Sequence, residues 1–229
     1  MDLYQRKASA LPQKIAANLV EIALLALSAW LLFGPGETYA AALFGFSPSA
    51  AVPARHIVIF CFSVITFLRF LFMMVFLMKR DMAWEEALSI SIAFFVYYVG
   101  FALIALPNTA PLGWPASLGI ALFALGAFLN TASEIQRDAF KKKPENKGKL
   151  YTGGLFGLSM HINFFGDILW VTGYALVAGN PWGGLIPVGL TLFFAFYNVP
   201  QLDRHLAARY GAAFEKYARR TKRLVPFVW

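Results

Sequence analysis

The segment MHINFFGDILW at 160–170 places three hydrogen-bonding side chains inside an otherwise apolar stretch. His161, Asn163 and Asp167 supply an imidazole, an amide and a carboxylate, so together they offer both donors and acceptors. Asn163 and Asp167 are four residues apart, and a helix would present both on one face. An aspartate at the centre of a membrane helix costs roughly 2.5–3.5 kcal/mol. The spacing therefore favours a site for a ligand with hydroxyl and carboxamide groups over a helix–helix hydrogen bond.

Other polar residues in apolar stretches are candidates for proton transfer or substrate contact, because intramembrane charges tend to pair and to mark function. They are Glu21, Arg69, Glu86, Tyr97 and Tyr98. A structural ion pair between Glu21 and Arg69 is the alternative interpretation. Glu86 and Glu85 are alternatively solvated carboxylates in the first turn of a helix. Gly166 has no side chain, which predicts an uncovered backbone patch that a flat ligand could approach.

The elements that position these residues must be membrane helices. The chain of 229 residues is 59% hydrophobic and 14% charged, whereas about 25% of residues are charged in a soluble domain. Six stretches are apolar and long enough to cross about 30 Å of hydrocarbon as helices. We place them at 16–34, 56–78, 84–106, 113–133, 161–179 and 183–200. The predicted fold class is all-α, a polytopic bundle of about six transmembrane helices. With a single cysteine, Cys61, we expect no metal site.

The basic residues predict the orientation of this bundle. All but two of the 20 Lys and Arg residues fall on one side of a six-span topology, the exceptions being Arg55 and Arg69. By the positive-inside rule both termini are cytoplasmic. Topology thus accounts for the net charge of +8, and we expect membrane lipids rather than nucleic acid as partners. The Ala-rich composition is typical of a bacterial protein, which would place the chain in the inner membrane.

Two basic segments carry more Lys and Arg residues than the positive-inside rule requires. The loop 134–154 and the tail 201–229 are long, face one compartment and are interleaved with Tyr and Phe. They could form a cationic basin for a phosphorylated ligand. Attraction to anionic lipid headgroups explains the same charges.

Three segments resemble a known family. HINFFGDILW is similar to the R-H-P-N-Y-x-G-[DE] stretch of the membrane-bound steroid 5-alpha-reductases, the sterol reductases and their bacterial relatives. Met160 and Ile162 stand where that stretch has Arg and Pro. EIQRDAFKKKP and the segment from Asp203 to Trp229 resemble the preceding and the closing motifs of the family. A related branch, which includes the isoprenylcysteine carboxyl methyltransferases, binds S-adenosylmethionine.

The resemblance implies an NADPH-dependent reductase of a carbon–carbon double bond in a lipid-soluble steroid, sterol or enone-like substrate. Residues 1–133 would form a four-span substrate side and 134–229 a cofactor-binding half of one integrated domain. Arg137 and Lys141 would meet phosphates, and Asn163 and Asp167 the nicotinamide–ribose end. The remaining residues implied for the same pocket are His161, Arg204, His205, Tyr210 and Tyr217.

The same resemblance implies that Glu21 and Arg69 would polarise a substrate carbonyl. Thr66 stands at the family's tyrosine position, so we expect Tyr97, Tyr98 or Glu86 to supply the proton instead. Two alternatives remain open. One is a methyltransferase of a lipid or prenylated thiol, and the other is a non-enzymatic scaffold or transporter. The sequence predicts no particular oligomeric state.

Overall fold

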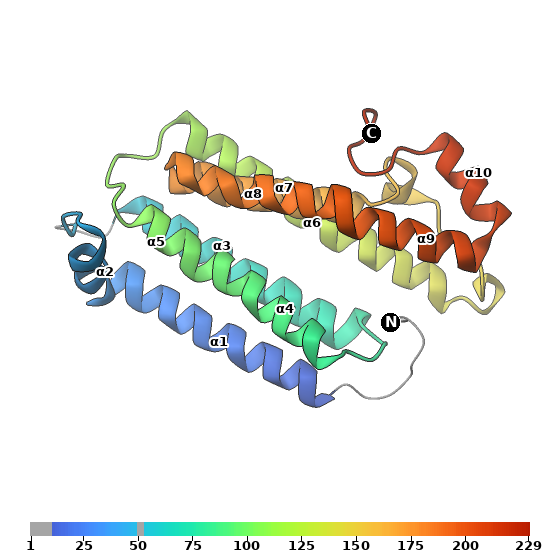
Figure 1. The fold of residues 1–229 in the computed structure, drawn as a ribbon, viewed down its shortest axis with the longest axis horizontal. Coiled ribbons are helices and arrows are strands. Elements are labelled where there is room, and N and C mark those ends of the chain that lie inside the picture. Colours follow the sequence, from blue (N-terminus) through green and yellow to red (C-terminus); the bar gives the residue numbers. More distant parts are fainter. Residues whose placement is uncertain (1–10, 50–52) are drawn as a thin grey trace. The chain divides into compact units, whose positions relative to one another are not determined.

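The computed structural model describes residues 11–49 and 53–229, and most of these residues are helical (Figure 1). Ser159 and Lys222 form one isolated bridge, and the described residues contain no β-strand. The prediction of an all-α fold is therefore confirmed.

Five stretches among the described residues are long and apolar enough to cross a membrane. They are α1 (Leu11–Phe33), Ala54–Leu77, Trp84–Ala105, α6 (Trp114–Lys142) and Pro181–Tyr210. Helix α7 (Ile162–Ala178) is apolar and has 17 residues, the lower end of the length range of spanning helices. The chain is an integral, multi-pass membrane protein, as its composition predicts.

Three of these stretches are built from shorter helices joined by π-helical turns. Ala54–Leu77 consists of α3 (Ala54–Phe72) and the turn Met73–Leu77. The stretch Trp84–Ala105 contains α4 (Trp84–Phe94), the π-helical turn Phe95–Gly100 and α5 (Phe101–Ala105). The stretch Pro181–Tyr210 contains α8 (Leu185–Phe193), the π-helical turn Phe194–Asn198 and α9 (Val199–Tyr210). Such turns are frequent at functional sites, and Phe95–Gly100 carries the candidate residues Tyr97 and Tyr98.

The chain divides into two compact units. Unit 1 comprises the described residues up to Ile120 together with Gly173–Gly184. Here α1 packs against α2 (Gly36–Phe44), α3 and α4. Tyr174, which α7 contributes, stacks on Phe101 with ring centroids 5.0 Å apart and meets Phe62 edge-on at 5.2 Å. Aromatic contacts of this kind join α3, α5 and α7 in the interior of unit 1.

Unit 2 comprises Ala121–Thr172 and Leu185–Trp229. Its last helix, α10 (Ala212–Arg220), packs on α9 and buries Phe214 and Tyr217 beside Met160. A second apolar cluster of unit 2 joins Leu129, Phe156 and Ile162. Unit 2 therefore has its own core, on which the polar residues described below are arranged.

Two helices extend beyond their predicted ends. We expected a loop from residue 134, but α6 continues to Lys142. Ion pairs on its last turns support the extension, since Glu134 contacts Arg137 and Asp138 lies 2.6 Å from Lys142. The last span likewise runs past residue 200 to Tyr210, because Pro200 lies in the first turn of α9, where proline is tolerated.

Candidate functional site

A polar face joins α6 and α7 in unit 2. The carboxylate of Asp167 accepts two hydrogen bonds at Oδ1, from Asn130 Nδ2 and from Trp170 Nε1, each 2.8 Å long. Asn130 Nδ2 also lies 3.3 Å from the backbone carbonyl of Asn163. Asn163 and Asp167 lie one turn apart on α7, as their spacing predicts.

A second carboxylate extends this face toward the end of α6. Asn163 Nδ2 donates to Glu134 Oε1 at 3.1 Å, and Glu134 forms an ion pair with Arg137 through its other oxygen. The guanidinium of Arg137 also lies over the ring of Phe156, 5.6 Å from its centroid. The α6–α7 polar face is hereafter the set Asn130, Glu134, Arg137, Asn163, Asp167 and Trp170.

The patch predicted at Gly166 is not open to a ligand. A Cβ added there would lie 2.7 Å from the backbone nitrogen of Asn130 and 2.8 Å from the carbonyl oxygen of Gly126. Gly166 is buried because α6 packs directly against it. The prediction of an uncovered backbone surface is therefore wrong, and this glycine serves the close approach of two helices.

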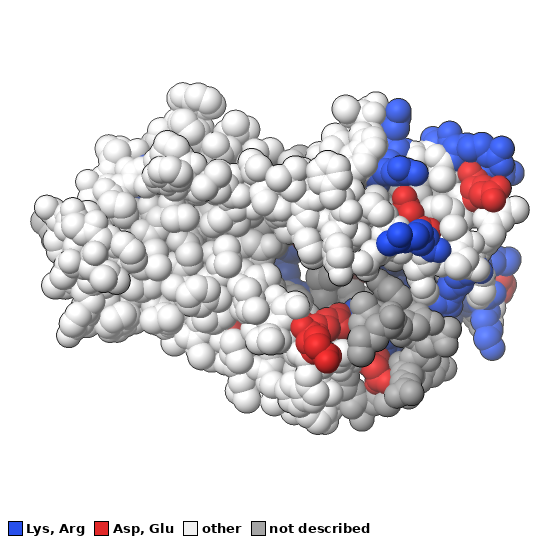
Figure 2. All heavy atoms as spheres, viewed as in Figure 1, with Lys and Arg blue, Asp and Glu red and all other residues white. Residues whose placement is uncertain are grey.

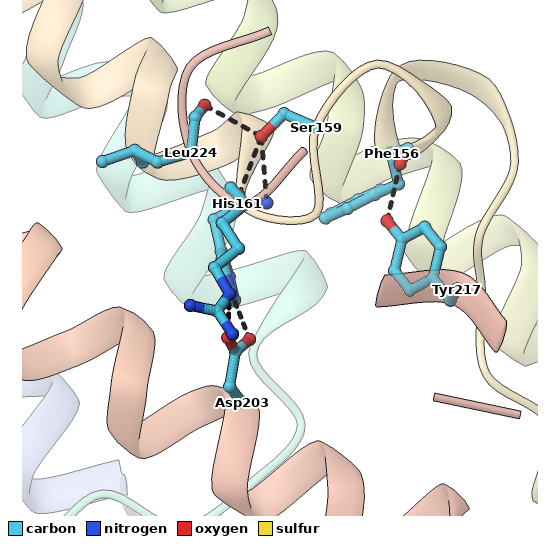
Figure 3. A network of polar contacts seen from close by, with 7 residues as sticks. Phe156, Ser159, His161, Asp203, Tyr217 and Leu224 are labelled. Atoms are coloured by element: carbon cyan, nitrogen blue, oxygen red, sulfur yellow. Dashed lines mark hydrogen bonds and ion pairs between the residues drawn. The ribbon is translucent and has the colours of Figure 1, made fainter. Parts of the chain in front are cut away.

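A separate network organises the end of unit 2 (Figure 3). His161, with 1% of its surface exposed, places Nε2 2.9 Å from Asp203 Oδ1 on α9. Asp203 Oδ2 lies 3.3 Å from Arg223 Nε. The hydroxyl of Ser159 donates toward the carbonyl oxygens of Arg223 and Leu224. His161 thus contacts Asp203 on α9 and the backbone of the 222–229 segment.

Basic side chains surround a cleft of about 460 Å³ in unit 2. The loop 148–152 forms one side of it, and the end of α9 and helix α10 form the other. We call it the cationic cleft; its basic and aromatic lining residues are Lys149, Arg209, Tyr210, Lys216, Tyr217 and Arg220. None of the described lining residues is acidic. Figure 2 shows Lys and Arg gathered over the α9–α10 region of unit 2.

Tyr217 links the cationic cleft to the α6–α7 polar face. Its hydroxyl donates to the carbonyl oxygen of Phe156 at 2.5 Å (Figure 3). Burial raises the pKa of the Tyr217 phenol, so the group remains a donor well above neutral pH. Because Arg137 lies over the ring of Phe156, contacts run continuously from Tyr217 to Glu134 and Asn163.

Unit 1 contains a buried acid in contact with a tyrosine. Tyr98 donates its hydroxyl to Glu21 Oε2 at 3.1 Å, and both residues have no exposed surface. Glu21 Oε1 is buried as well and makes no hydrogen bond. Nearby in unit 1, Tyr174 donates to the hydroxyl of Ser63 at 3.2 Å. A carboxyl group with one free buried oxygen can bond a further polar group.

A family model decides the relationship of this chain to known proteins. The model of DUF1295, described as a protein of unknown function, matches residues 32–221. The chain belongs to the DUF1295 family. The matched range contains the whole cationic cleft and the α6–α7 polar face.

Relatives of this DUF1295 protein are membrane reductases and methyltransferases. The probable O-methyltransferase ustE of Ustilaginoidea virens is 41% identical over 95 residues, 40% of this chain and 32% of the relative. The human 3-oxo-5-alpha-steroid 4-dehydrogenase 2 is 33% identical over 126 residues, which are 52% of this chain and 46% of the relative. The mouse delta(14)-sterol reductase is 25% identical over 177 residues, which are 69% of this chain and 39% of the relative. The chain therefore spans less than half of the length of each of these three relatives. The predicted resemblance to the superfamily of membrane reductases and methyltransferases is confirmed.

The predicted cofactor residues of the DUF1295 protein all lie in unit 2. Tyr210 and Tyr217 line the cationic cleft, and Arg137, Asn163 and Asp167 belong to the polar face. Lys141 and Arg204 are exposed on α6 and α9, and His205 is partly buried on α9. Their roles toward a cofactor stay predictions.

Of the predicted catalytic residues, Glu21 and Tyr98 are in direct contact. Glu86 instead forms a two-pronged ion pair with Arg80, 2.7 Å from Glu86 Oε2 to Arg80 Nη1. Tyr97 is partly buried and meets Phe94 edge-on at 5.9 Å. Arg69 is partly buried in α3. Its contact with Glu21 thus favours Tyr98 among the three predicted proton donors.

Several residues of the site escaped the sequence analysis. Asn130 and Glu134 on α6 are four residues apart, as are Asn163 and Asp167 on α7. This second pair of polar residues with helical spacing was the signal in the sequence that could have identified them. Asp203 gave no such signal, because it lies in a charged segment where an acid is ordinary. The cleft residues Lys149, Lys216 and Arg220 were part of the predicted basic basin, but only the fold selects them from its other cations.

Proposed function

We propose that this protein is an NADPH-dependent membrane reductase that reduces a carbon–carbon double bond in a steroid, a sterol or an enone-like lipid. The observation that carries the proposal is the cationic cleft, where Lys149, Arg209, Lys216 and Arg220 surround about 460 Å³. NADPH carries a diphosphate and a further ribose phosphate. Clustered Arg and Lys side chains are the usual partners of such groups.

The same cleft is poorly suited to the cofactor of the related methyltransferases. S-adenosylmethionine carries a positive sulfonium group and no phosphate. Four basic side chains with no acidic residue among the described lining would not stabilise that charge. The electrostatics of unit 2 therefore support NADPH.

The α6–α7 polar face would hold the nicotinamide end. Asn163 and Asp167 offer the mixed donors and acceptors that ribose hydroxyls and a carboxamide need, and both are only partly buried. Continuous contacts through Tyr217, Phe156 and Arg137 join this face to the cationic cleft. They support one elongated site in unit 2, in which Lys141, Arg204 and His205 would meet the outer parts of the cofactor.

When bound, NADPH supplies the hydride, and the chain must supply the proton. Tyr98 is the proposed donor, because its hydroxyl is buried and oriented by Glu21. Glu21 Oε1 has no hydrogen-bond partner, so this oxygen could bond a polar group of the substrate. Arg69 and Tyr97 would act on the substrate side. The lipid-soluble substrate would enter from the bilayer among the spans of the amino-terminal half.

The orientation follows from the charges. We propose that both termini and the cofactor site face the cytoplasm of a bacterial cell, with the chain in the inner membrane. The basic loop and tail, which hold the cationic cleft, would then meet the cytoplasmic pool of NADPH.

A methyltransferase is the second candidate, because the probable O-methyltransferase ustE is 41% identical over 95 residues. In that case the α6–α7 polar face would hold S-adenosylmethionine, and a lipid or prenylated thiol would accept the methyl group. A non-enzymatic scaffold or transporter would require neither cofactor.

The experiment is isothermal titration of the detergent-purified protein with NADPH, NADH and S-adenosylmethionine side by side. We expect NADPH to bind, S-adenosylmethionine not to bind, and Lys216→Gln with Arg220→Gln to weaken NADPH binding. Binding of S-adenosylmethionine alone would overturn the reductase in favour of the methyltransferase. Binding of none, with an intact thermal unfolding transition, would overturn both enzymatic proposals. If NADPH binds, the next measurement is whether enone lipids or sterols oxidise it in the presence of the protein.

A further inference from the structure

The segment that follows α10 folds back on itself in a short closed turn. The backbone nitrogens of Leu224 and Val225 both donate to the carbonyl oxygen of Trp229 at 2.8 Å. Val228 and Trp229 donate in return to the carbonyl oxygen of Val225 at 3.1 Å. Pro226 has no backbone donor. Four backbone N–H groups of the turn Leu224–Trp229 are thus paired within it.

The base of this turn is fixed to unit 2. Met160 and His161 donate their backbone nitrogens to the carbonyl oxygens of Lys222 and Arg223 at 2.8 and 2.9 Å. The hydroxyl of Ser159 reaches the carbonyl oxygen of Leu224 at 2.8 Å (Figure 3). The position of the turn is therefore set by specific contacts.

The tip of the turn is apolar and uncovered. Phe227 has 81% of its surface exposed and Val228 has 73%. Phe227 is also the one described residue other than glycine with a positive φ, at 65°. A left-handed backbone is unfavourable for a bulky residue, and it directs a large apolar side chain away from the protein. The geometry implies a surrounding medium that accepts this side chain.

The apolar neighbours of the turn show what that medium is. Leu224 is fully buried against Phe194 and Val199, which belong to the span Pro181–Tyr210, and Val225 packs on the same cluster. Val199 lies roughly 16 Å along the helix from its end at Tyr210, at 1.5 Å per residue. Phe196, three residues before Val199 on the same span, is 78% exposed. The turn therefore lies beside a membrane-spanning segment.

Basic side chains precede the apolar tip. Arg219, Lys222 and Arg223 are exposed in the residues just before it, and none of the three lines the cationic cleft. Apolar and aromatic side chains next to Lys and Arg are typical of segments at the surface of an anionic bilayer. Each basic residue near such a surface contributes about 1 kcal/mol of attraction.

We propose that the turn Leu224–Trp229 is an interfacial membrane anchor, which inserts Phe227 and Val228 into the bilayer and sets Lys222 and Arg223 against anionic phospholipid headgroups. This surface is separate from the cofactor site. It fixes the 222–229 segment, and with it Asp203 and His161, at the level of the membrane surface. The proposal does not depend on the identity of the cofactor.

Nitroxide accessibility tests the proposal on the full chain in lipid nanodiscs that contain phosphatidylglycerol. In a Cys61→Ser background, single cysteines replace Phe227, the exposed Phe196 of the span Pro181–Tyr210 and the exposed Glu215 of α10. We expect the label at 227 to collide with oxygen rather than with a water-soluble nickel chelate, as at 196. A chelate-accessible label at 227, as at 215, would overturn the proposal. So would a label at 227 shielded from both reagents, because another protein surface would then cover it.

A charge variant tests the headgroup contact separately. Lys222→Gln should shift the label at 227 toward the chelate in phosphatidylglycerol nanodiscs and leave the label at 196 unchanged. No shift at 227 would overturn the role assigned to the basic residues. Neither measurement involves NADPH or a substrate, so failure here leaves the proposed reductase untouched, and failure of the reductase leaves the anchor untouched.

Discussion

The hydroxyl of Tyr98 donates to Glu21 Oε2 at 3.1 Å in the interior of unit 1, and the two residues are 77 positions apart in the sequence. If this pair provides the proton, Tyr98→Phe removes the donor but keeps the ring and its packing. We expect turnover with an enone lipid to fall by about 10²–10⁴, the usual contribution of a general acid. Steady-state kinetics would measure the loss, and NADPH affinity should not change.

The matched control for Tyr98→Phe is Tyr39→Phe, which removes a hydroxyl from an exposed tyrosine of the same unit. This variant should keep its full turnover. Equal rates for the wild type and Tyr98→Phe would remove Tyr98 from the mechanism and return the role to Tyr97.

A second prediction concerns the carboxylate of Asp167. Asp167→Asn keeps an oxygen that can accept from Asn130 and Trp170, so the helices should stay paired. The charge is lost, and a hydrogen bond to a charged group is worth about 1.5–3 kcal/mol. We therefore expect NADPH affinity to fall roughly tenfold to a hundredfold, measured by isothermal titration. Glu215→Gln, which removes an exposed carboxylate of α10 that pairs with Arg219 and does not line the cationic cleft, should bind normally; equal affinities for both variants would exclude a cofactor contact at Asp167.

A third prediction concerns the electrostatics of the cationic cleft. Lys216→Gln removes one of its four positive charges, whereas Lys143→Gln removes an exposed charge that does not line it. Titrations over a range of salt concentrations should show weaker NADPH binding and a shallower salt dependence for Lys216→Gln alone, because ions screen charge–charge attraction. If both variants lose affinity equally, net charge rather than the cleft attracts the ligand.

The membrane helices could be predicted from the sequence because hydrocarbon imposes one strong requirement, a run of apolar residues of sufficient length. Their ends could not be predicted as well. Helix α6 continues for about two turns past its apolar part, where ion pairs such as Asp138–Lys142 replace burial in lipid as the stabilising interaction. A hydropathy profile does not detect such ion pairs.

The residue types of the site could be predicted, but not their partners. Asn163 and Asp167 fall on one helical face as expected, yet the side chains that meet them, Glu134 and Asn130, come from a helix 29 and 37 positions earlier in the sequence. His161 belongs to the same sequence motif but faces Asp203, because it precedes the first turn of α7. Local spacing fixes directions within one helix and says nothing about which other helix packs there.

The last prediction concerns Gly166, where the sequence suggested an open surface and the fold has two helices in contact. A Cβ at this position would meet backbone atoms of Asn130 and Gly126 at 2.7 and 2.8 Å, and neither is the flexible end of a side chain. Gly166→Ala must therefore push α6 and α7 apart, which we expect to destabilise the protein by about 1–3 kcal/mol. The shift would also misalign Asn130 and Asp167, so NADPH affinity should fall together with the thermal midpoint.

Gly189→Ala is the control for this substitution, since a Cβ on α8 at that position would meet nothing within 4 Å. Alanine favours a helix over glycine by about 0.8–1.0 kcal/mol, so the midpoint of Gly189→Ala should stay constant or rise slightly in a detergent thermal-shift assay. The thermal midpoint should therefore fall for Gly166→Ala and stay constant or rise for Gly189→Ala. This difference separates the effect of helix contact from that of helix propensity. If Gly166→Ala behaves like Gly189→Ala, α6 and α7 are not packed backbone to backbone, and the close pairing of Asn130 with Asp167 loses its structural basis.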